Sequence, residues 1–183
     1  RTLDLEDESA EKFGISRASG LLPDGTPFMM PQIDPLPPAV DLPADVKAEL
    51  VCLAIPLQRE GVEAFSFEGA QRAGMNRYTV EQVEVRDATD VSDEPVTIQT
   101  GRLNARLMRA KEARDAFATL GVAMVIERRA DGMVVLDRGY IAPQVRIDAT
   151  RQLSSNVDLI HGLVRQRAEA LAARMGQLSH GVS

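Results

Sequence analysis

Apolar and polar residues alternate along several short stretches of the first 150 residues. The clearest is 96–108, where Leu103, Ala105 and Leu107 alternate with polar side chains. A period of two is typical of a strand with one buried face. Similar patterns predict strands at 15–22, 28–30, 49–57, 78–85, 120–126, 133–136 and 144–147. Because no helical period interrupts them, the pattern predicts a mainly β chain folded as an antiparallel β-sandwich.

Turn residues separate these stretches. Residues 22–28 read Leu-Pro-Asp-Gly-Thr-Pro-Phe, in which Pro presets φ, Asp bonds its own backbone and Gly accepts a positive φ. This run predicts one hairpin, and Ala130-Asp131-Gly132 predicts another. Five prolines in 31–43 predict an extended connector that crosses between sheets.

Four stretches are expected to be irregular. The acid-rich residues 2–12 are predicted to form a short helical turn, and the glycine-containing residues 62–76 a flexible loop. The alternation slips between Val80 and Val83, which predicts a bulge. It also changes phase at Gly101, where a strand is expected to bend or restart.

The last 30 residues follow a helical period instead. Apolar residues spaced by three, four and seven form a heptad pattern, which we call the helix seam: Leu153, Val157, Ile160, Val164, Leu171 and Leu178. A helix over 153–175 is predicted, with N-cap candidates at Thr150, Ser154 and Ser155. We therefore expect a β-sandwich domain at 1–150 and a helical segment at 151–183.

The seam has two interpretations. The helix either folds back on its own sheet or packs against the same helix of other copies. Arg167 and Arg174 interrupt a strict two-stranded coil, and the alanines at 168, 170, 172 and 173 keep the neighbouring surface narrow. Narrow side chains let several helices approach closely, which favours an oligomerising bundle of more than two helices.

Composition narrows the function classes. The net charge of −6 argues against a nucleic-acid binder, whose affinity rests on basic residues. Cys52 is the single cysteine and lies in an apolar stretch, which predicts core packing rather than catalysis. No apolar run approaches the ~20 residues of a membrane helix, so no direct membrane insertion is expected. The chain opens at Arg1 without a secretory signal, so we expect an intracellular protein and a fragment of a longer one.

Candidate chemistry is sparse. His161 and His180 lack the Cys or carboxylate neighbours of a metal site. The acids at 87, 90, 93 and 94 do not have the spacing of a calcium loop. Nucleotide-binding and metalloprotease motifs are absent from the sequence. We therefore predict no catalytic residues, no metal site and no cofactor. A local basic stripe is a candidate docking surface for an acidic protein partner, formed by Arg102, Arg106 and Arg109 with Lys111 and Arg114.

Several segments resemble, in order, the TssK family of type VI secretion baseplate subunits. They are Ala-Ser-Gly-Leu-Leu-Pro-Asp-Gly-Thr-Pro-Phe at 18–28, Leu-Pro-Pro at 36–38, Leu-Ala-Ile-Pro-Leu at 53–57, Leu-Asp-Arg-Gly-Tyr-Ile-Ala-Pro at 136–143 and Leu-Ala-Ala-Arg at 171–174. The resemblance implies a cytoplasmic homotrimer. Its β-sandwich shoulder would dock on baseplate wedge proteins, its helical neck would trimerise, and a C-terminal head would contact the membrane complex. The family's opening Pro-Gln-His-Phe-Gln-type motif and its head have no counterpart in this sequence, so membrane-complex binding is not expected.

The leading hypothesis is thus a structural adaptor of a contractile secretion machine. The alternative is a phage-like receptor-binding or carbohydrate-binding β-sandwich. Sugar sites usually present exposed aromatics, and the sequence has no Trp and only Tyr78 and Tyr140 as tyrosines. A hydrolase on a β scaffold is a third hypothesis, which the shortage of His and Cys disfavours.

Overall fold

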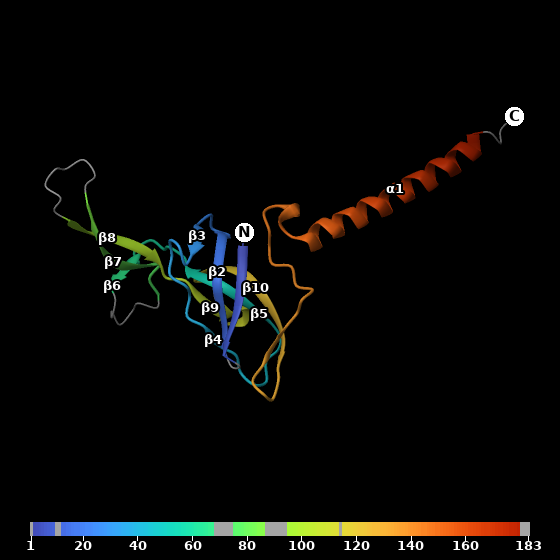
Figure 1. Cartoon of the computed structure of the whole chain (residues 1–183). Helices are drawn as coiled ribbons and strands as arrows, with labels where there is room; N and C mark the ends of the chain where they lie inside the picture. Colours follow the sequence, from blue (N-terminus) through green and yellow to red (C-terminus); the bar gives the residue numbers. More distant parts are fainter. Residues whose placement is uncertain (1, 10–11, 68–74, 87–94, 114, 180–183) are drawn as a thin grey trace. The chain divides into compact units, whose positions relative to one another are not determined.

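The structure, a computed structural model, describes residues 2–9, 12–67, 75–86, 95–113 and 115–179, without the side chains of 2–9 and 176–179. It divides into two compact units, Arg1–Ala142 and Pro143–Ser183. The first unit holds three β-sheets and the second a long helix (Figure 1). The predicted mainly β, antiparallel fold with a C-terminal helix is confirmed.

The first sheet has the order β1-β2-β3, with β4 also paired to β2. Its strands are β1 (Thr2–Ser9), β2 (Lys12–Leu21), β3 (Pro27–Met30) and β4 (Val40–Asp41). The predicted hairpin joins β2 to β3, and Gly25 at its turn has a φ of 88°. The helical turn expected at 2–12 is wrong, because β1 pairs antiparallel with β2. The Leu3–Leu5 alternation was the strand signal in that stretch.

The second sheet has the order β11-β10-β5-β9 and contains the centre of the core. Its strands are β5 (Lys47–Pro56), β9 (Arg106–Arg109), β10 (Phe117–Arg128) and β11 (Val134–Leu136). Residues 51–56 of β5 are all buried, as expected of a strand covered on both faces. Gly132 at the predicted β10–β11 turn has a φ of 88°. The hairpin expected there is confirmed.

Strand β10 does not keep the alternation expected from its sequence. A register shift between Gly121 and Ala123 changes the phase of the strand. Leu120 is buried before the shift, Val122 is buried within it, and Ala123 and Val125 are buried after it. Ile126, expected on the same buried face, is instead exposed.

The third sheet has the order β6-β7-β8 and lies to one side of the other two sheets within the first unit (Figure 1). Its strands are β6 (Phe65–Phe67), β7 (Tyr78–Val85) and β8 (Val96–Leu103). Strand β6 runs parallel to β7, so part of the stretch expected to be a loop is a strand. The β7–β8 register is continuous, so the expected bulge is wrong, and the strand does not end and restart at Gly101. The break comes after Leu103 instead.

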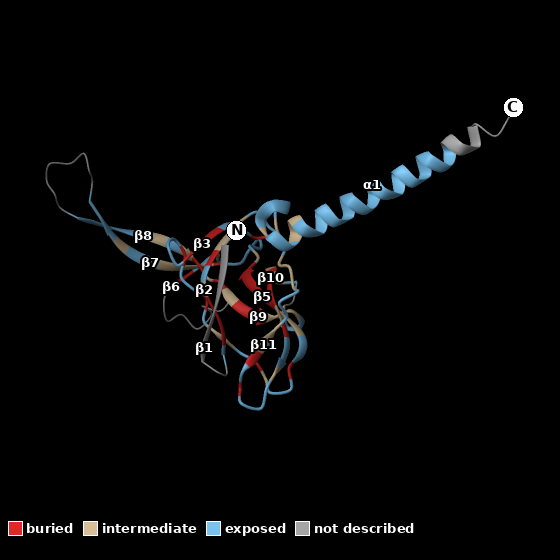
Figure 2. Ribbon diagram, turned by 45° about the vertical axis from the view of Figure 1, so that its right-hand side comes forward, coloured by how far each residue is buried: buried red, intermediate tan, exposed pale blue. Residues whose placement is uncertain are grey.

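The buried core is largely aliphatic, with Phe13 and Phe28 as its aromatic members among the described residues. Val51, Ala54, Ile55 and Val125 are fully buried. Cys52 packs as a buried hydrophobe beside them, and burial raises the pKa of its thiol. Figure 2 shows this core in red on the second sheet.

The second unit begins with the 3-10 turn η2 (Ile147–Ala149) and continues as α1 (Arg151–Ser179). The strand expected at 144–147 is therefore wrong. Its alternation of valine and isoleucine is too short to form a strand without a neighbouring strand to pair with. The helix starts two residues before the predicted range and ends four after it. Thr150 caps it, since its Oγ1 accepts a hydrogen bond from the Leu153 backbone N–H at 3.2 Å.

Candidate protein interaction surfaces

The helix seam is exposed along most of its described length. Every side chain from residue 155 to 175 is exposed, as the pale blue of α1 in Figure 2 shows. Val164 and Leu171 are 61% and 57% exposed, and Val157 and Ile160 are exposed as well. Leu153 is half-buried, and the side chain of Leu178 lies outside the described residues. Large aliphatic side chains in water along one helix face are typical of a surface that packs against another chain.

The opposite face of α1 carries charged side chains, together with the exposed Leu159. Arg165 and Glu169 form an ion pair across one helical turn, with Nε and Oε1 3.0 Å apart. Both residues fall between the seam positions of the heptad, as does Asp158. A seam of apolar residues with charged pairs on the opposite face is the pattern of a helix that associates along one side.

The apolar surface continues onto the segment before the helix. Val145 is 82% exposed and Ile147 is also exposed. Together with Val157 and Ser154 they line an open hollow beside the first helical turns. Arg146 and Asp148 form an ion pair at 2.6 Å at its edge. Residues 145–147 therefore add exposed apolar surface beside the N-terminal end of the seam.

The three arginines predicted to form a basic stripe are not gathered on one surface. Arg102 belongs to β8, whereas Arg106 and Arg109 belong to β9 of another sheet. Arg106 and Arg109 are three residues apart on a strand and so point to opposite faces.

Each arginine also has a partner within the chain. Arg102 bonds the Glu81 carboxylate and the Ile33 carbonyl, both at 2.6 Å. The Arg106 guanidinium lies 5.2 Å from the centre of the Phe117 ring, and burial lowers its pKa. Arg109 is paired with Glu112 of the 3-10 turn η1 (Ala110–Glu112).

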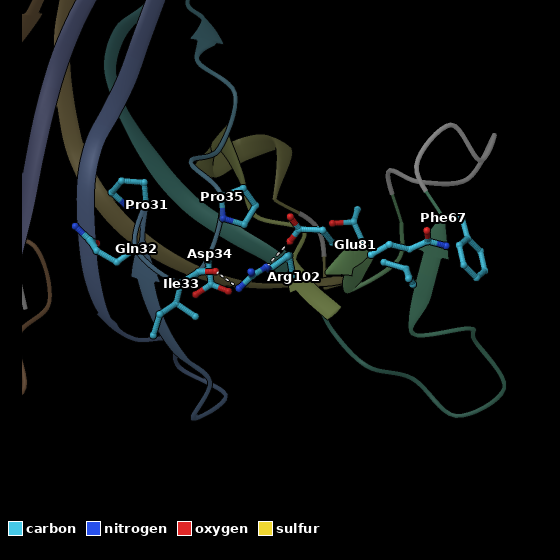
Figure 3. A pocket seen from close by; sticks show the side chains of 11 residues that line it. Pro31, Gln32, Ile33, Asp34, Pro35, Phe67, Glu81 and Arg102 are labelled. Atoms are coloured by element: carbon cyan, nitrogen blue, oxygen red, sulfur yellow. Dashed lines mark hydrogen bonds and ion pairs between the residues drawn. The ribbon is translucent and has the colours of Figure 1, made fainter. Parts of the chain in front are cut away.

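An open hollow lies between residues 31–35 and sheet β6-β7-β8 (Figure 3). Arg102 crosses it, bonded to Glu81 on one side and to the Ile33 carbonyl on the other. Asp34 accepts a hydrogen bond from the Met29 N–H at 3.2 Å. The Arg102, Glu81 and Asp34 side chains thus have hydrogen-bond partners inside the chain.

Sheet β6-β7-β8 carries exposed apolar side chains on both faces. Phe65 and Phe67 are 54% and 60% exposed, and the Phe65 ring stacks on Tyr78 with centroids 5.3 Å apart. Gly101 makes room for that ring, since an added Cβ would lie 3.1 Å from it. On the other face, Val96 and Ile98 lie opposite Val85 and Val83. This surface was not predicted from the sequence, although Val83, Val85, Val96 and Ile98 were a visible signal.

Part-buried polar contacts hold the base of this sheet together, and Arg77 joins that base to the rest of the first unit. Asn76 donates from Nδ2 to the carbonyls of Glu63 and Phe65 at 2.7 and 3.0 Å. Asn104 donates from Nδ2 to the Asn76 carbonyl at 2.8 Å and from its backbone N–H to the Arg77 carbonyl at 2.9 Å.

Arg77 completes this attachment. Its guanidinium donates to the Pro56 carbonyl at 2.8 Å and to the Asp24 carboxylate at 2.6 Å, and it also bonds Thr26. It thereby joins the turn after β2, the end of β5 and the start of β7. Burial alone would raise the pKa of Asp24, but the bonds from Arg77 and from the Thr26 N–H outweigh it and lower that pKa. Nothing in the sequence singled out this arginine.

The remaining candidates from the sequence concern metal binding and membrane insertion. Within the described ranges, no cluster of three or more His, Cys, Asp or Glu side chains has the arrangement of a metal site. His161 is exposed on α1. His180 and the acids at 87–94 lie outside the described residues. Among the helices of the described residues, none has the length and hydropathy needed to cross a bilayer.

Comparisons with known proteins agree on one family. The family model of bacterial type VI secretion proteins VC_A0110, EvfL, ImpJ and VasE matches residues 2–183. The type VI secretion system baseplate component TssK1 of Pseudomonas aeruginosa is 36% identical over 170 residues, which is 93% of this chain and 38% of that protein.

Solved structures give the same result. A crystal structure of TssK has a TM-score of 0.77 and 32% identity, over 95% of this chain and 40% of that one. A chain of a TssK-TssF-TssG baseplate subcomplex solved by cryo-electron microscopy shares the fold, with a TM-score of 0.71 and 24% identity, over 93% of this chain and 57% of that one. This chain thus spans less than two thirds of each of these relatives. The predicted resemblance is confirmed, and the chain belongs to the VasE family of bacterial type VI secretion proteins, the family of the baseplate component TssK.

Proposed function

We propose that this chain is a non-catalytic structural adaptor of the type VI secretion baseplate, which works in the cytoplasm. In this proposal the helix seam joins it to other copies of itself, and the β unit docks on other baseplate components. The observation that carries the proposal is the exposed aliphatic seam of α1. Relatives that occur in a TssK-TssF-TssG subcomplex make TssF and TssG the expected partners.

The energetics favour self-association of the helix. Burying a Val, Leu or Ile side chain completely stabilises by roughly 1.5–3 kcal/mol. The seam side chains from Val157 to Leu171 are about half exposed, so each has on the order of 1 kcal/mol still to gain. Several such residues on each of several helices are enough to offset the entropy lost on association.

The geometry favours more than two helices, and we propose a homotrimer. Ala168 and Ala170 flank the seam, so neighbouring helices can approach closely. The arginines at 167 and 174 disfavour the narrow core of a two-stranded coil. Exposed Val145 and Ile147 add apolar surface at the start of the assembled bundle.

Docking to the wedge proteins is assigned to the β unit. Phe65, Phe67, Val96 and Ile98 offer exposed apolar surface on sheet β6-β7-β8. Arg102 and Arg109 remain proposed contacts, and a partner carboxylate would replace Glu81 and Glu112 as their counter-ions.

The self-association is tested by placing charges on the seam. Val164→Asp with Leu171→Asp should lower the mass measured by light scattering while the β circular-dichroism signal is kept. The matched control is Gln166→Asp with Ala173→Asp, which has the same seven-residue spacing off the seam and should keep the oligomer. If the seam variant unfolds the β unit, or if both variants lose the oligomer equally, the proposal is wrong.

A recognition module remains the second candidate, because Phe65 and Phe67 are exposed aromatics of the kind that stack on sugars. The two functions differ in what they bind. A structural adaptor should retain TssF and TssG in a pull-down and bind nothing on a glycan array. Binding of a defined glycan, lost in Phe67→Ala, would favour the alternative.

A further inference from the structure

The helix seam continues through two arginines. Ile160, Arg167 and Arg174 follow each other at intervals of seven residues, and Leu171 lies between the two arginines. On a helix, residues seven apart lie on the same face. Arg167 and Arg174 therefore occupy the same seam position that Ile160 occupies one or two repeats earlier.

The surface around these arginines is hollow. An open depression on α1 is lined by Leu163, Gln166, Arg167, Ala170, Leu171 and Arg174. Ala168 and Ala170 stand on either side of the seam next to Arg167. Because alanine carries only a methyl group, space is left beside the guanidinium even when a second helix approaches.

The charge of the helix is unbalanced here. Helix α1 contains four arginines and two carboxylates. Glu169 is paired with Arg165 at 3.0 Å, and Asp158 lies more than two turns before Arg167. Among the described residues, neither Arg167 nor Arg174 forms an ion pair or a hydrogen bond with another side chain. Their positive charge is thus not neutralised within the helix.

Self-association would bring these charges together. When parallel helices pack along the seam, the guanidinium groups of one layer converge from every copy, and burying like charges without a counter-ion is strongly unfavourable. A guanidinium offers donors in a planar fork that fits an oxyanion in a bidentate manner. We propose that the Arg167 and Arg174 layers of the assembled helices bind phosphate-type oxyanions, each held by arginines of several copies.

This inference rests on the proposed self-association. It makes an oxyanion part of the bundle, so that binding the anion and assembling the helices stabilise each other. The alternative is that the long arginine side chains extend to the surface and leave their charges in water. The two arrangements differ in how assembly responds to phosphate.

The test measures the apparent association constant of the full chain by sedimentation, in inorganic phosphate and in chloride at equal ionic strength. At a phosphate concentration about twenty times the dissociation constant of one layer, the association constant should rise about twenty-fold for each layer occupied. Millimolar phosphate is used, because at high concentration phosphate strengthens apolar burial in any protein.

Three variants separate the explanations. Arg167→Leu with Arg174→Leu should assemble at lower protein concentration and lose the phosphate response. Arg167→Lys with Arg174→Lys should assemble like the parent with a weaker response, because lysine cannot bind in a bidentate manner. Arg165→Leu, on the polar face, should keep the full response.

The outcomes are distinguishable. If the parent assembles equally well in phosphate and chloride, or if Arg165→Leu loses the response as completely as the seam variants, the oxyanion site is wrong while self-association stands. If the parent forms no oligomer in any buffer, the proposed self-association fails and the site fails with it.

Discussion

Among side chains outside the proposed interaction surfaces, Arg77 is the one whose loss should lower the free energy of unfolding of the β unit most. Arg77→Met removes the guanidinium and keeps much of the aliphatic stem. The Asp24 carboxylate, only 20% exposed, and the Pro56 carbonyl then lose their donor. Removing one partner of a buried ion pair typically costs about 3–5 kcal/mol. Asp24 keeps the Thr26 N–H at 3.1 Å and some water contact, so we expect about 3 kcal/mol.

The assay is urea unfolding followed by circular dichroism, together with hydrogen exchange of β7 and β8. Because Arg77 joins the third sheet to the other two, amides of β7 and β8 should lose more protection than those of β5. A double-mutant cycle with Asp24→Asn should give a coupling energy of about 1–3 kcal/mol. A cost below about 1 kcal/mol with unchanged exchange in β7 and β8 would refute this account of the attachment.

The pH dependence gives an independent test. The pKa of Asp24 is lowered in the folded protein, so its contribution is fully present above the unfolded-state pKa of 3.8 and is lost as the pH falls below that value. In Arg77→Met the hydrogen bond and charge of Arg77 no longer lower the pKa of this carboxyl, so stability should gain less as the pH rises through the titration of Asp24. The difference between the two stability curves must therefore widen from about pH 3 to about pH 6. A constant difference would contradict the pairing.

Two further predictions concern close packing. An alanine Cβ at Gly121 would lie 2.5 Å from the Tyr140 hydroxyl, so Gly121→Ala should cost about 1–3 kcal/mol and change tyrosine fluorescence. Gly162→Ala, with nothing within 4 Å, should stabilise α1 by about 1 kcal/mol, measured by thermal unfolding. Burial raises the pKa of the Cys52 thiol, so its reaction with a disulfide reagent should follow unfolding; reaction of the native protein at the rate of a free thiol would be inconsistent with this packing.

Local patterns were enough to predict much of the fold. The Pro-Asp-Gly and Ala-Asp-Gly turns specify their hairpins through residues that accept the required φ values, and Gly25 and Gly132 both have a φ of 88°. The aliphatic run at 49–57 predicted the central strand β5. The heptad spacing predicted α1 to within a few residues at each end.

The errors arose where a partner strand decides the structure. The stretch 2–12 is rich in acids, but pairing with β2 makes its residues Thr2–Ser9 a strand. The shift in β10 after Gly121 comes from its register with β5, and this moved Ile126 to the exposed side. The arginine stripe looked continuous in the sequence. The break between β8 and β9, which no local pattern showed, places Arg102 in one sheet and Arg106 and Arg109 in another. The contacts of Arg77 join residues 21 to 53 positions apart, which no local pattern reports.

The way sheet β6-β7-β8 is anchored has an evolutionary consequence. At its base, Asn76 and Asn104 donate hydrogen bonds to main-chain carbonyls, atoms that every amino acid supplies. Substitutions at Phe67, Val96 or Ile98 therefore leave these hydrogen bonds in place. In the docking proposed above, a few substitutions on this sheet could exchange one partner specificity for another while the base of the sheet stays intact.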